Sequence, residues 1–208
     1  GLVGIDMNIP LHLAARESLD QDELKSSFDK LTSSRSLFLY NHFGSIEPEI
    51  LINQIRELAT VDKVDVVILD HLSIVVSGVL DKIGDERKGL DLITTKLRSL
   101  AEETNIALIV VSHLSRPQGK GHEEGAVTSL AQLRGSGSIA QLSDMVLGLE
   151  RDSQSEDIVM RNTTCLRVLK NRFVGMTGPA TYLYYDKDTG RLHETDKPSP
   201  EDKEEDKF

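Results

Sequence analysis

Two apolar, β-branched runs separated by an amphipathic stretch constrain the fold of this chain more than any other feature. The runs are VDVVILD, residues 64–70, and NIALIVVSH, residues 105–113. Such runs are typical of strands buried on both faces of a parallel sheet. The stretch from Asp85 to Thr104 carries apolar residues at helical spacing, namely Leu90, Ile93, Leu97 and Leu100. The sequence therefore predicts a parallel strand–helix–strand unit inside an α/β fold, with helices on both faces of the sheet.

Further elements are predicted on both sides of this unit. Upstream, the patterns indicate helical segments at residues 11–15, 23–31 and 48–60 and a short apolar, aromatic strand at residues 36–40. Downstream, they indicate a third core strand at residues 145–149 and two more strands at residues 163–170 and 180–185. A hairpin turn is expected at residues 186–190, with Gly190 in the left-handed position. The mostly parallel sheet should thus end with antiparallel strands at its C-terminal side.

The length of 208 residues fits one domain at residues 1–194 followed by an acidic tail at residues 195–208. The formal net charge is −10, and the tail holds six acidic residues and three lysines, so residues 1–194 account for −7. Because the tail has two prolines, dense charge and almost nothing to bury, we expect it to be disordered. An acidic chain is poorly suited to coat nucleic acid with its whole surface, but local basic residues can bind it.

The rest of the composition excludes several classes of protein. No run approaches the ~18 apolar residues of a membrane span, so no membrane partner is expected. The start, GLVGIDMNIP, has no basic segment, no long apolar segment and no initiator Met, so we expect a fragment rather than a signal peptide. Cys165 is the only cysteine, which excludes an internal disulfide and a cysteine-based zinc site and fits a reducing, cytoplasmic setting.

Two polar residues follow the central strands. Asp70 follows VVIL and His113 follows IVVS. Ligands of open α/β sheets bind at the carboxyl ends of the strands, so both side chains can face one site. Asp70 fits the Walker B pattern, in which a carboxylate binds the water shell of Mg²⁺ on a nucleotide; the alternative is a cap of the following turn. His113 fits a sensor of the γ-phosphate; the alternative is an ordinary polar residue at a strand end.

Two basic segments lie downstream. LRGSGSIAQLSD, residues 133–144, places a Gly/Ser loop behind Arg134, which suits a phosphate backbone, although a plain surface loop has the same composition. Residues 161–172 hold four basic residues and no acid. In an extended chain Lys170 and Arg172 lie on one face, so the pair suits a phosphate, or else it protects an edge strand.

The order of these segments resembles a known family. ILDHLSIVVSG, DERK, VSHLSRPQGKGHEEG, LRGSGSIAQLSD, LER and LKNRFVGMTG succeed one another within residues 36–194. In this order they resemble the RecA-like helicase domain of DnaB-type hexameric replicative helicases, and most of all the primase-helicases of short-tailed phages and their mitochondrial relative Twinkle. The resemblance implies a RecA-like P-loop NTPase core that uses ATP, or another NTP, and Mg²⁺.

The resemblance assigns four residues to catalysis at the ATP site. Asp70 takes the place of the Walker B aspartate, which holds Mg²⁺ through water. His113 takes the place of the histidine that contacts the γ-phosphate and links hydrolysis to the DNA loops. Arg172 takes the place of the arginine finger that reaches the ATP site of the neighbouring subunit, with Lys170 beside it.

The same resemblance assigns residues to the adenine base and to DNA. Tyr185 takes the place of an aromatic residue that packs near the base, and Arg151 flanks it. The first DNA-facing loop holds Arg116 and Lys120. The next loop segment, which couples DNA to the nucleotide, holds Arg134, Gly135, Ser136 and Gly137. Because residues 114–138 have few apolar anchors, we expect these loops to be mobile without DNA.

The chain also departs from the family pattern. It contains no GxxxxGK[ST] Walker A sequence, and in the family this P-loop and the catalytic glutamate precede the region matched here. Ala140 stands where phage members often have another arginine, and the first DNA-facing loop is less rich in lysine. We expect this chain alone not to hydrolyse ATP, because nothing in it cradles the β- and γ-phosphates.

The leading hypothesis is the C-terminal part of an ATP-dependent DNA helicase from a bacterial or phage-infected cytoplasm rather than the mitochondrial matrix. A finger that acts in trans requires a head-to-tail interface, and such interfaces close into rings. The ring, expected to be a hexamer, would translocate on single-stranded DNA, unwind duplex DNA and work with a primase domain or protein. The alternatives are a recombinase-like or circadian-clock-type ATPase and a catalytically inactive binding module of the RecA fold.

Overall fold

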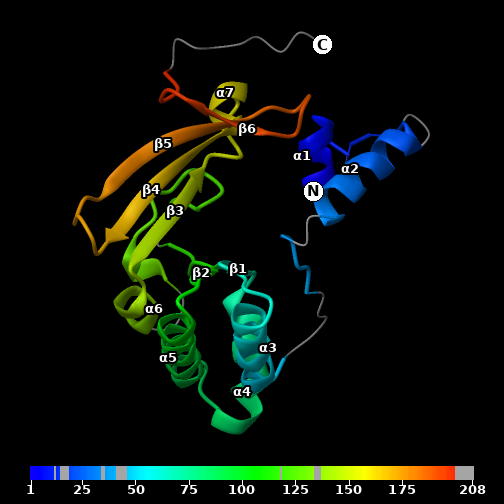
Figure 1. Cartoon of the computed structure of the whole chain (residues 1–208). Coiled ribbons are helices and arrows are strands. Elements are labelled where there is room, and N and C mark those ends of the chain that lie inside the picture. Colours follow the sequence, from blue (N-terminus) through cyan, green and yellow to red (C-terminus); the bar gives the residue numbers. More distant parts are fainter. Residues whose placement is uncertain are drawn as a thin grey trace.

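The computed structural model describes residues 1–11, 13–14, 19–33, 36–40, 46–117, 119–133 and 137–199, apart from the side chains of residues 79–82. In Figure 1 a helical unit with two strands lies at the bottom, an antiparallel sheet stands above it, and two N-terminal helices lie to one side. The predicted α/β class is confirmed. The tail boundary stays a prediction, because residues 200–208 lie outside the described residues.

The parallel unit forms as the sequence predicts. β1 (Val66–Leu69) and β2 (Ala107–Val110) pair in parallel. Two helices connect them: α4 (Leu72–Ile83), which was not predicted, and α5 (Glu86–Thr104). The Asp85 side chain accepts hydrogen bonds from two backbone N–H groups and caps the start of α5. α3 (Pro48–Thr60) begins with its proline in the first turn, where a missing N–H removes no helical hydrogen bond.

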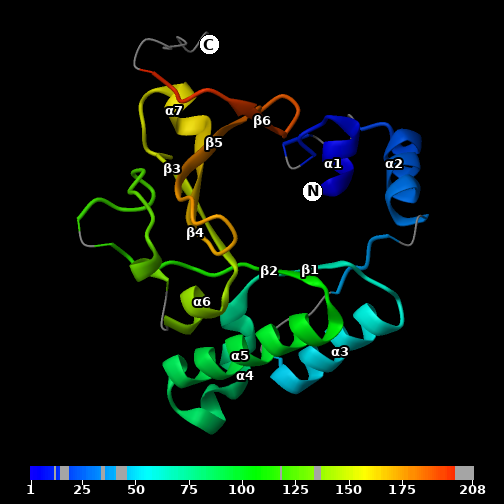
Figure 2. The same cartoon turned by 60° about the vertical axis from the view of Figure 1, so that its left-hand side comes forward.

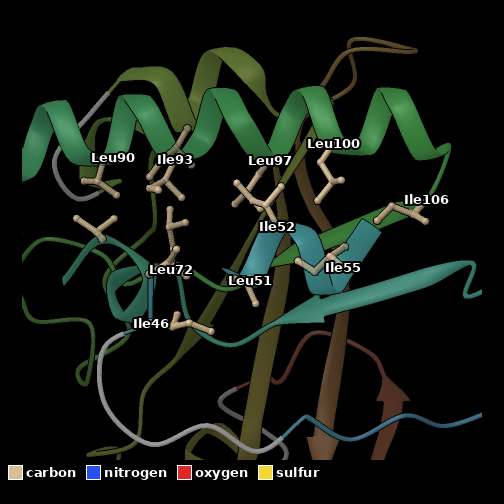
Figure 3. Close-up of a cluster of buried hydrophobic side chains, with 13 residues drawn as sticks. Ile46, Leu51, Ile52, Ile55, Leu72, Leu90, Ile93, Leu97, Leu100 and Ile106 are labelled. Carbon is tan, nitrogen blue, oxygen red and sulfur yellow. The ribbon is translucent and has the colours of Figure 1, made fainter. Parts of the chain in front are cut away.

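The apolar core lies between these helices and one face of the two strands (Figure 3). Ile93 of α5 has no exposed surface. The helices supply most of the core side chains, including Leu90, Ile93, Leu97 and Leu100 from α5 and Leu51, Ile52 and Ile55 from α3. Gly78 allows α4 to approach the preceding chain closely, because a Cβ there would lie 2.0 Å from the carbonyl oxygen of Ile46.

The opposite face of β1 and β2 is exposed, which corrects the expectation of strands buried on both faces. Val66 and Ile68 of β1 are 51% and 69% exposed, and Ile109 of β2 is 52% exposed. Side chains alternate across a strand, and α3, α4 and α5 all lie on one side of the pair (Figure 2). Within the described residues, helices therefore cover one face of this sheet and not both.

The C-terminal half forms a four-stranded antiparallel sheet in the order β3–β4–β5–β6. Its strands are β3 (Met145–Arg151), β4 (Thr163–Asn171), β5 (Gly178–Tyr185) and β6 (Leu192–Thr195). Three short helical pieces flank it: a 3₁₀ turn (Leu130–Gln132), α6 (Gly137–Leu142) and α7 (Ile158–Asn162). The predicted hairpin turn after β5 is confirmed, with Gly190 at a φ of 70°.

The two sheets are separate, whereas the sequence predicted one sheet that continues from parallel to antiparallel strands. β3 was expected to be a core strand, yet Met145, Leu147 and Leu149 on one of its faces are 46%, 50% and 67% exposed. Within the described residues β2 and β3 each pair along one edge only. No described strand joins these two free edges into one sheet.

Two N-terminal helices lie beside the C-terminal hairpin (Figure 1). The Asp6 side chain of α1 (Leu2–Met7) accepts hydrogen bonds from Ser27 and Lys30 of α2 (Gln21–Ser33) at 2.9 and 2.5 Å. Arg191, which precedes β6, donates from Nε to the carbonyl oxygen of Ile5 at 3.1 Å. The helix predicted at residues 23–31 is confirmed as α2, and α1 was not predicted.

Two other upstream predictions are wrong. Residues 36–40 form no strand, and their apolar side chains are exposed, from 37% for Leu37 to 77% for Leu39. Of residues 11–15 the described ones form turns and not a helix, with the N–H groups of Leu13 and Ala14 directed to the carbonyl oxygen of Pro10. Short apolar runs carry too little periodicity to separate strand, helix and turn. No described helix is long and apolar enough to cross a membrane.

Candidate functional site

The carboxyl ends of β1 and β2 meet at one edge, as their parallel pairing requires. Asp70 directly follows β1, His113 lies beyond the end of β2, and both residues are exposed. The N–H of Val111 donates to the carbonyl oxygen of Leu69 at 2.9 Å, which carries the strand pairing to this edge. The structure thus brings Asp70 and His113 to neighbouring strand ends, where the sequence placed them; their roles stay predictions.

His71 lies between the two strand ends, because it follows Asp70 and its ring packs against that of His113. It was not predicted from the sequence. The centroid of its ring lies 4.3 Å from that of His113, and the two rings are tilted by 44°. Its Nδ1 atom is buried and has no hydrogen-bond partner among the described residues. The signal was present in the sequence, since this histidine directly follows the aspartate in ILDH.

Lys170, at the end of β4, donates hydrogen bonds to backbone carbonyl oxygens of the same chain. Its Nζ atom donates to three carbonyl oxygens at and beyond the end of α6: those of Ala140 at 2.7 Å, Gln141 at 3.1 Å and Ser143 at 2.7 Å. An ammonium group has three donors, and a helix leaves its last carbonyl groups without helical partners. Lys170 therefore supports the end of α6, and its predicted role beside the finger stays a prediction.

Arg172, just beyond β4, is held by Asp144 at the entry to β3. Its Nη1 atom donates to Oδ1 of Asp144 at 3.2 Å, and its backbone N–H donates to the carbonyl oxygen of Asp144 at 2.8 Å. Arg98 of α5 donates to the other carboxylate oxygen. The hydrogen bond from Arg98 lowers the pKa of Asp144 most, and that from Arg172 adds to it. Neither Arg98 nor Asp144 was predicted, although Asp144 ends the LRGSGSIAQLSD motif.

Arg151 and Tyr185, predicted to lie near the adenine base, both lie at the other end of the antiparallel sheet. Arg151 ends β3 and Tyr185 ends β5, and the antiparallel register places both at the same end of the sheet, on either side of β4. Arg172 follows the opposite end. At about 3.3 Å per residue, β3 therefore separates Arg151 from Arg172 by roughly 20 Å. The Nε atom of Arg151 donates to the carbonyl oxygen of Arg161 at 2.7 Å.

The segment between β2 and α6 leaves the sheet and returns to its starting point, as the green loop of Figure 2 shows. Leu114 and Leu133 form an antiparallel bridge, and the N–H of Ser115 donates to the carbonyl oxygen of Gln132 at 2.8 Å. These contacts close the loop at its base. The described residues between these contacts therefore belong to one loop whose two ends are paired.

The residues predicted to contact DNA lie on or next to this loop. Arg116 is exposed near its base, and the Lys120 ammonium lies 3.8 Å from a carboxylate oxygen of Asp152. Gly137 begins α6. The other three predicted residues, Arg134, Gly135 and Ser136, lie outside the described residues.

A buried carboxylate fixes the middle of the loop to β3. Glu150 is 9% exposed and accepts hydrogen bonds from the N–H of Thr128 at 2.7 Å, its hydroxyl at 2.8 Å, and Nε of Arg167 at 2.6 Å. Burial alone would raise the pKa of Glu150, but the hydrogen bonds from Arg167 and Thr128 outweigh burial and lower it. Gly148 permits this approach, since a Cβ there would lie 2.1 Å from the Thr128 hydroxyl. The loop thus has a polar anchor that the sequence reasoning missed.

The chemistry of the strand edge fits a nucleotide with its magnesium ion. Mg²⁺ is usually held by one or two carboxylates together with phosphates and water. Asp70 supplies one exposed carboxylate, and His113 supplies a hydrogen-bonding ring beside it. Among the described residues no group of three His, Cys, Asp or Glu side chains is arranged for a metal. With one carboxylate from Asp70, the other ligands of a magnesium ion at this edge would be phosphates and water.

Comparison with known proteins agrees with these features. The family model of the DnaB-like helicase C-terminal domain matches residues 2–194. The chain belongs to this family. The DNA helicase/primase of Enterobacteria phage T3 is 42% identical over 166 residues, which are 79% of this chain and 28% of that protein. The replicative DNA helicase DnaB of Treponema pallidum (strain Nichols) is 32% identical over 97 residues, which are 47% of this chain and 20% of that protein.

A solved structure shares the fold of this DnaB-family chain. It is a DnaB-like replicative helicase described with its interactions with primase, and the TM-score is 0.69 at 22% identity. The match covers 92% of this chain and 46% of that one. At this identity the likeness shows the fold alone, and it confirms the predicted RecA-like class. The chain spans only 28% of the length of the phage protein.

Proposed function

We propose that this chain is part of an ATP-dependent replicative DNA helicase, a ring that translocates on single-stranded DNA and unwinds duplex DNA. The observation that carries the proposal is the strand edge shared by Asp70 and His113 in a member of the DnaB-like helicase family. Both residues are exposed at an edge where α/β folds bind ligands. A structural cap would not require a second polar side chain from the neighbouring strand.

In this proposal the strand edge is one wall of an ATP site. Asp70 would hold Mg²⁺ through water, and the ion would neutralise charge on the transferring phosphoryl group. His113 would donate a hydrogen bond to the γ-phosphate. His71 packs against His113 and directly follows Asp70, so it would keep the two groups in a fixed relation.

The phosphate cradle would come from another segment of the whole protein. The chain has no GxxxxGK[ST] sequence. It also leaves apolar faces uncovered on β1, β2 and β3, where Ile68 is 69% and Leu149 is 67% exposed. Large exposed apolar patches generally mark surfaces that something else covers. We infer that a P-loop-bearing segment packs on these faces and completes the site.

Arg172 would serve the ATP of a neighbouring subunit. It lies roughly 20 Å along β3 from Arg151, which we assign with Tyr185 to the adenine base. One ATP molecule does not suit both ends of the sheet, whereas ATP between subunits does. Lys170, whose ammonium group is bound to three carbonyl oxygens, would support this end rather than reach a phosphate.

The loop closed by Leu114 and Leu133 would face single-stranded DNA, with Arg116 and Lys120 on it and the segment 134–137 next to it. The support is the place of Arg116 and Lys120 on this loop, where they are exposed together with Glu123 and Glu124, whose charges offset theirs. A primase domain or protein would be the partner in replication. The phage T3 relative is a helicase/primase, and the solved DnaB-like helicase is described with its interactions with primase.

A mixing experiment with the whole protein tests the proposal. Arg172→Ala subunits and Asp70→Asn subunits should each lose ATP hydrolysis, since an arginine finger contributes about 10³–10⁵ in rate. Mixed rings should regain part of it, because some interfaces combine an intact Asp70 with an intact Arg172. Titration of wild-type subunits with each variant is the control. Full-rate hydrolysis by the Arg172→Ala protein would contradict the proposal, as would turnover by this chain alone that Asp70→Asn abolishes.

A further inference from the structure

We propose that Asp144 is a positioning residue for Arg172, and that Arg98 holds the Asp144 carboxylate in place. The inference rests on the trans role proposed above for Arg172. It adds two residues from other elements, one from the entry to β3 and one from α5. It also assigns a reason for placing a carboxylate beside an arginine that must meet a phosphate.

Two contacts with Asp144 fix the position of Arg172. Asp144 holds Arg172 at two points, because its carbonyl oxygen accepts the backbone N–H at 2.8 Å and its carboxylate accepts Nη1 at 3.2 Å. The backbone contact fixes where the side chain starts, and the carboxylate contact fixes one edge of the guanidinium group. An arginine side chain has many rotamers, so a partner that selects one of them reduces the ordering needed when a phosphate binds.

Most N–H donors of the Arg172 guanidinium group remain available for a phosphate. The Arg172 side chain is 60% exposed, and Asp144 is the only partner of its guanidinium group among the described residues. A guanidinium group has five N–H donors, so one hydrogen bond leaves most of the planar fork directed to solvent. The contact therefore orients the group without covering the part that would meet a phosphate.

A second arginine holds the Asp144 carboxylate. Arg98 donates to the second oxygen of Asp144, and its hydrogen bond is the main cause of the lowered pKa of that carboxyl. Two guanidinium groups thus share one ionised carboxylate, and Arg98 is itself fixed on α5 by Glu102, whose carboxylate accepts a hydrogen bond from Nε of Arg98 at 2.8 Å. Asp144 is thus held through one oxygen by Arg98, and its other oxygen is left to orient the exposed guanidinium group of Arg172.

The backbone before Asp144 is also held in place. Lys170 donates to the carbonyl oxygens of Ala140, Gln141 and Ser143, which immediately precede it. β4 thereby holds the end of α6, and the N–H of Arg172 returns to the same segment. Asp144 stands on backbone that is fixed from two sides, as a positioning residue requires.

The test uses ATP hydrolysis by the whole protein. Asp144→Ala should lower kcat by about 10- to 100-fold, the cost of misplacing a group by about an ångström. The KM for ATP should change little, because the finger acts on developing charge and not on ground-state binding. Asp144→Asn keeps an oxygen acceptor and should retain more activity than Asp144→Ala. The matched control is Arg56→Ala, which removes an exposed arginine–carboxylate pair with Glu103 elsewhere on α5.

Two readouts separate positioning from general structure. In an Arg172→Ala background, Asp144→Ala should add no further loss of kcat. In mixed rings, Asp144→Ala subunits should be rescued by Asp70→Asn subunits, which supply an intact Arg172 across the interface. A loss that persists without Arg172, or that no mixing rescues, would overturn the inference. If Asp144→Ala does not fold, Asp144→Asn and Arg98→Ala go through the same two assays, and Arg98→Ala should also lower kcat.

The outcome also distinguishes this inference from the proposed function. Full activity of the Arg172→Ala protein removes the trans finger and with it the need for Asp144. An inactive Arg172→Ala protein together with a fully active Asp144→Ala protein overturns only the positioning role.

Discussion

Thirteen of the fourteen buried apolar residues in the described part of the chain form one cluster, and all but Ile139 of these lie within residues 46–106. The antiparallel sheet adds only Val146. Its interior instead holds polar groups, above all Glu150 between Arg167 and Thr128. The parallel unit is therefore stabilised by apolar packing, and the antiparallel sheet by its backbone ladders and a buried ion pair.

This difference matches the positions of the proposed functions. The parallel unit holds Asp70 and His113 on a packed base, as a site for a small ligand requires. The antiparallel sheet joins the loop that we propose to face DNA, through Thr128 and Glu150, to β4, whose far end leads to Arg172. Polar contacts of this kind depend on geometry more than apolar packing does, so a change at one member is transmitted to its partners.

The largest expected effect is in the apolar core. Ile93→Ala should lower the free energy of unfolding by about 2–5 kcal/mol, because the side chain is fully buried and its removal leaves a cavity. Urea unfolding of the chain measures it. The matched control is Leu92→Ala, the neighbouring residue on α5, which is 42% exposed and should cost far less. Equal losses at the two positions would mean that α5 does not pack as described.

The second effect tests whether the antiparallel sheet depends on its ion pair. Arg167→Met keeps an apolar stem but leaves Glu150 buried with one partner fewer, and should cost about 2–3 kcal/mol. The loss should be seen in unfolding monitored at β3 and β4. Arg56→Met, which breaks a bidentate but exposed pair with Glu103, should cost much less. A similar loss for both variants would contradict the assigned role of burial.

The same contrast explains how much of the fold could be predicted. α3 and α5 were predicted almost to the residue, because Leu90, Ile93 and Leu97 repeat at helical spacing and Pro48 and Asp85 mark the starts. The separation of the two sheets could not be predicted. Runs such as VVIL are apolar on both faces whether or not another layer covers each face. The residue pattern of a strand also does not determine which other strand it pairs with.

For the candidate site, the sequence indicated the residues at strand ends but not their supports. Asp70 and His113 follow apolar strands, so topology alone places them together. Asp144, Arg98 and Glu150 act through contacts across 17 to 46 positions of sequence, and no local pattern indicates these. Lys170 was assigned to a phosphate from its position two residues before Arg172, but its partners are carbonyl oxygens.

The smallest expected effect concerns pH and sharpens the comparison further. The pKa of Glu150 lies below its ordinary value, so the stability that this group contributes is complete above about pH 4.3 and is lost as the pH falls through its folded-state pKa. Unfolding free energies measured from about pH 7 to about pH 3 should fall less steeply for Glu150→Gln than for the unaltered chain.

Position should matter as much as charge in this experiment. Hydrogen exchange should show β3 and β4 opening at acid pH before α3 and α5, because the buried side chains described in the parallel unit include no titrating group. Glu103→Gln, at the exposed end of α5, is the control and should leave the acid opening of β3 and β4 unchanged. If α5 opens first, or if Glu150→Gln leaves the acid opening of β3 unaltered, then the buried carboxylate is not what makes the antiparallel sheet sensitive to pH.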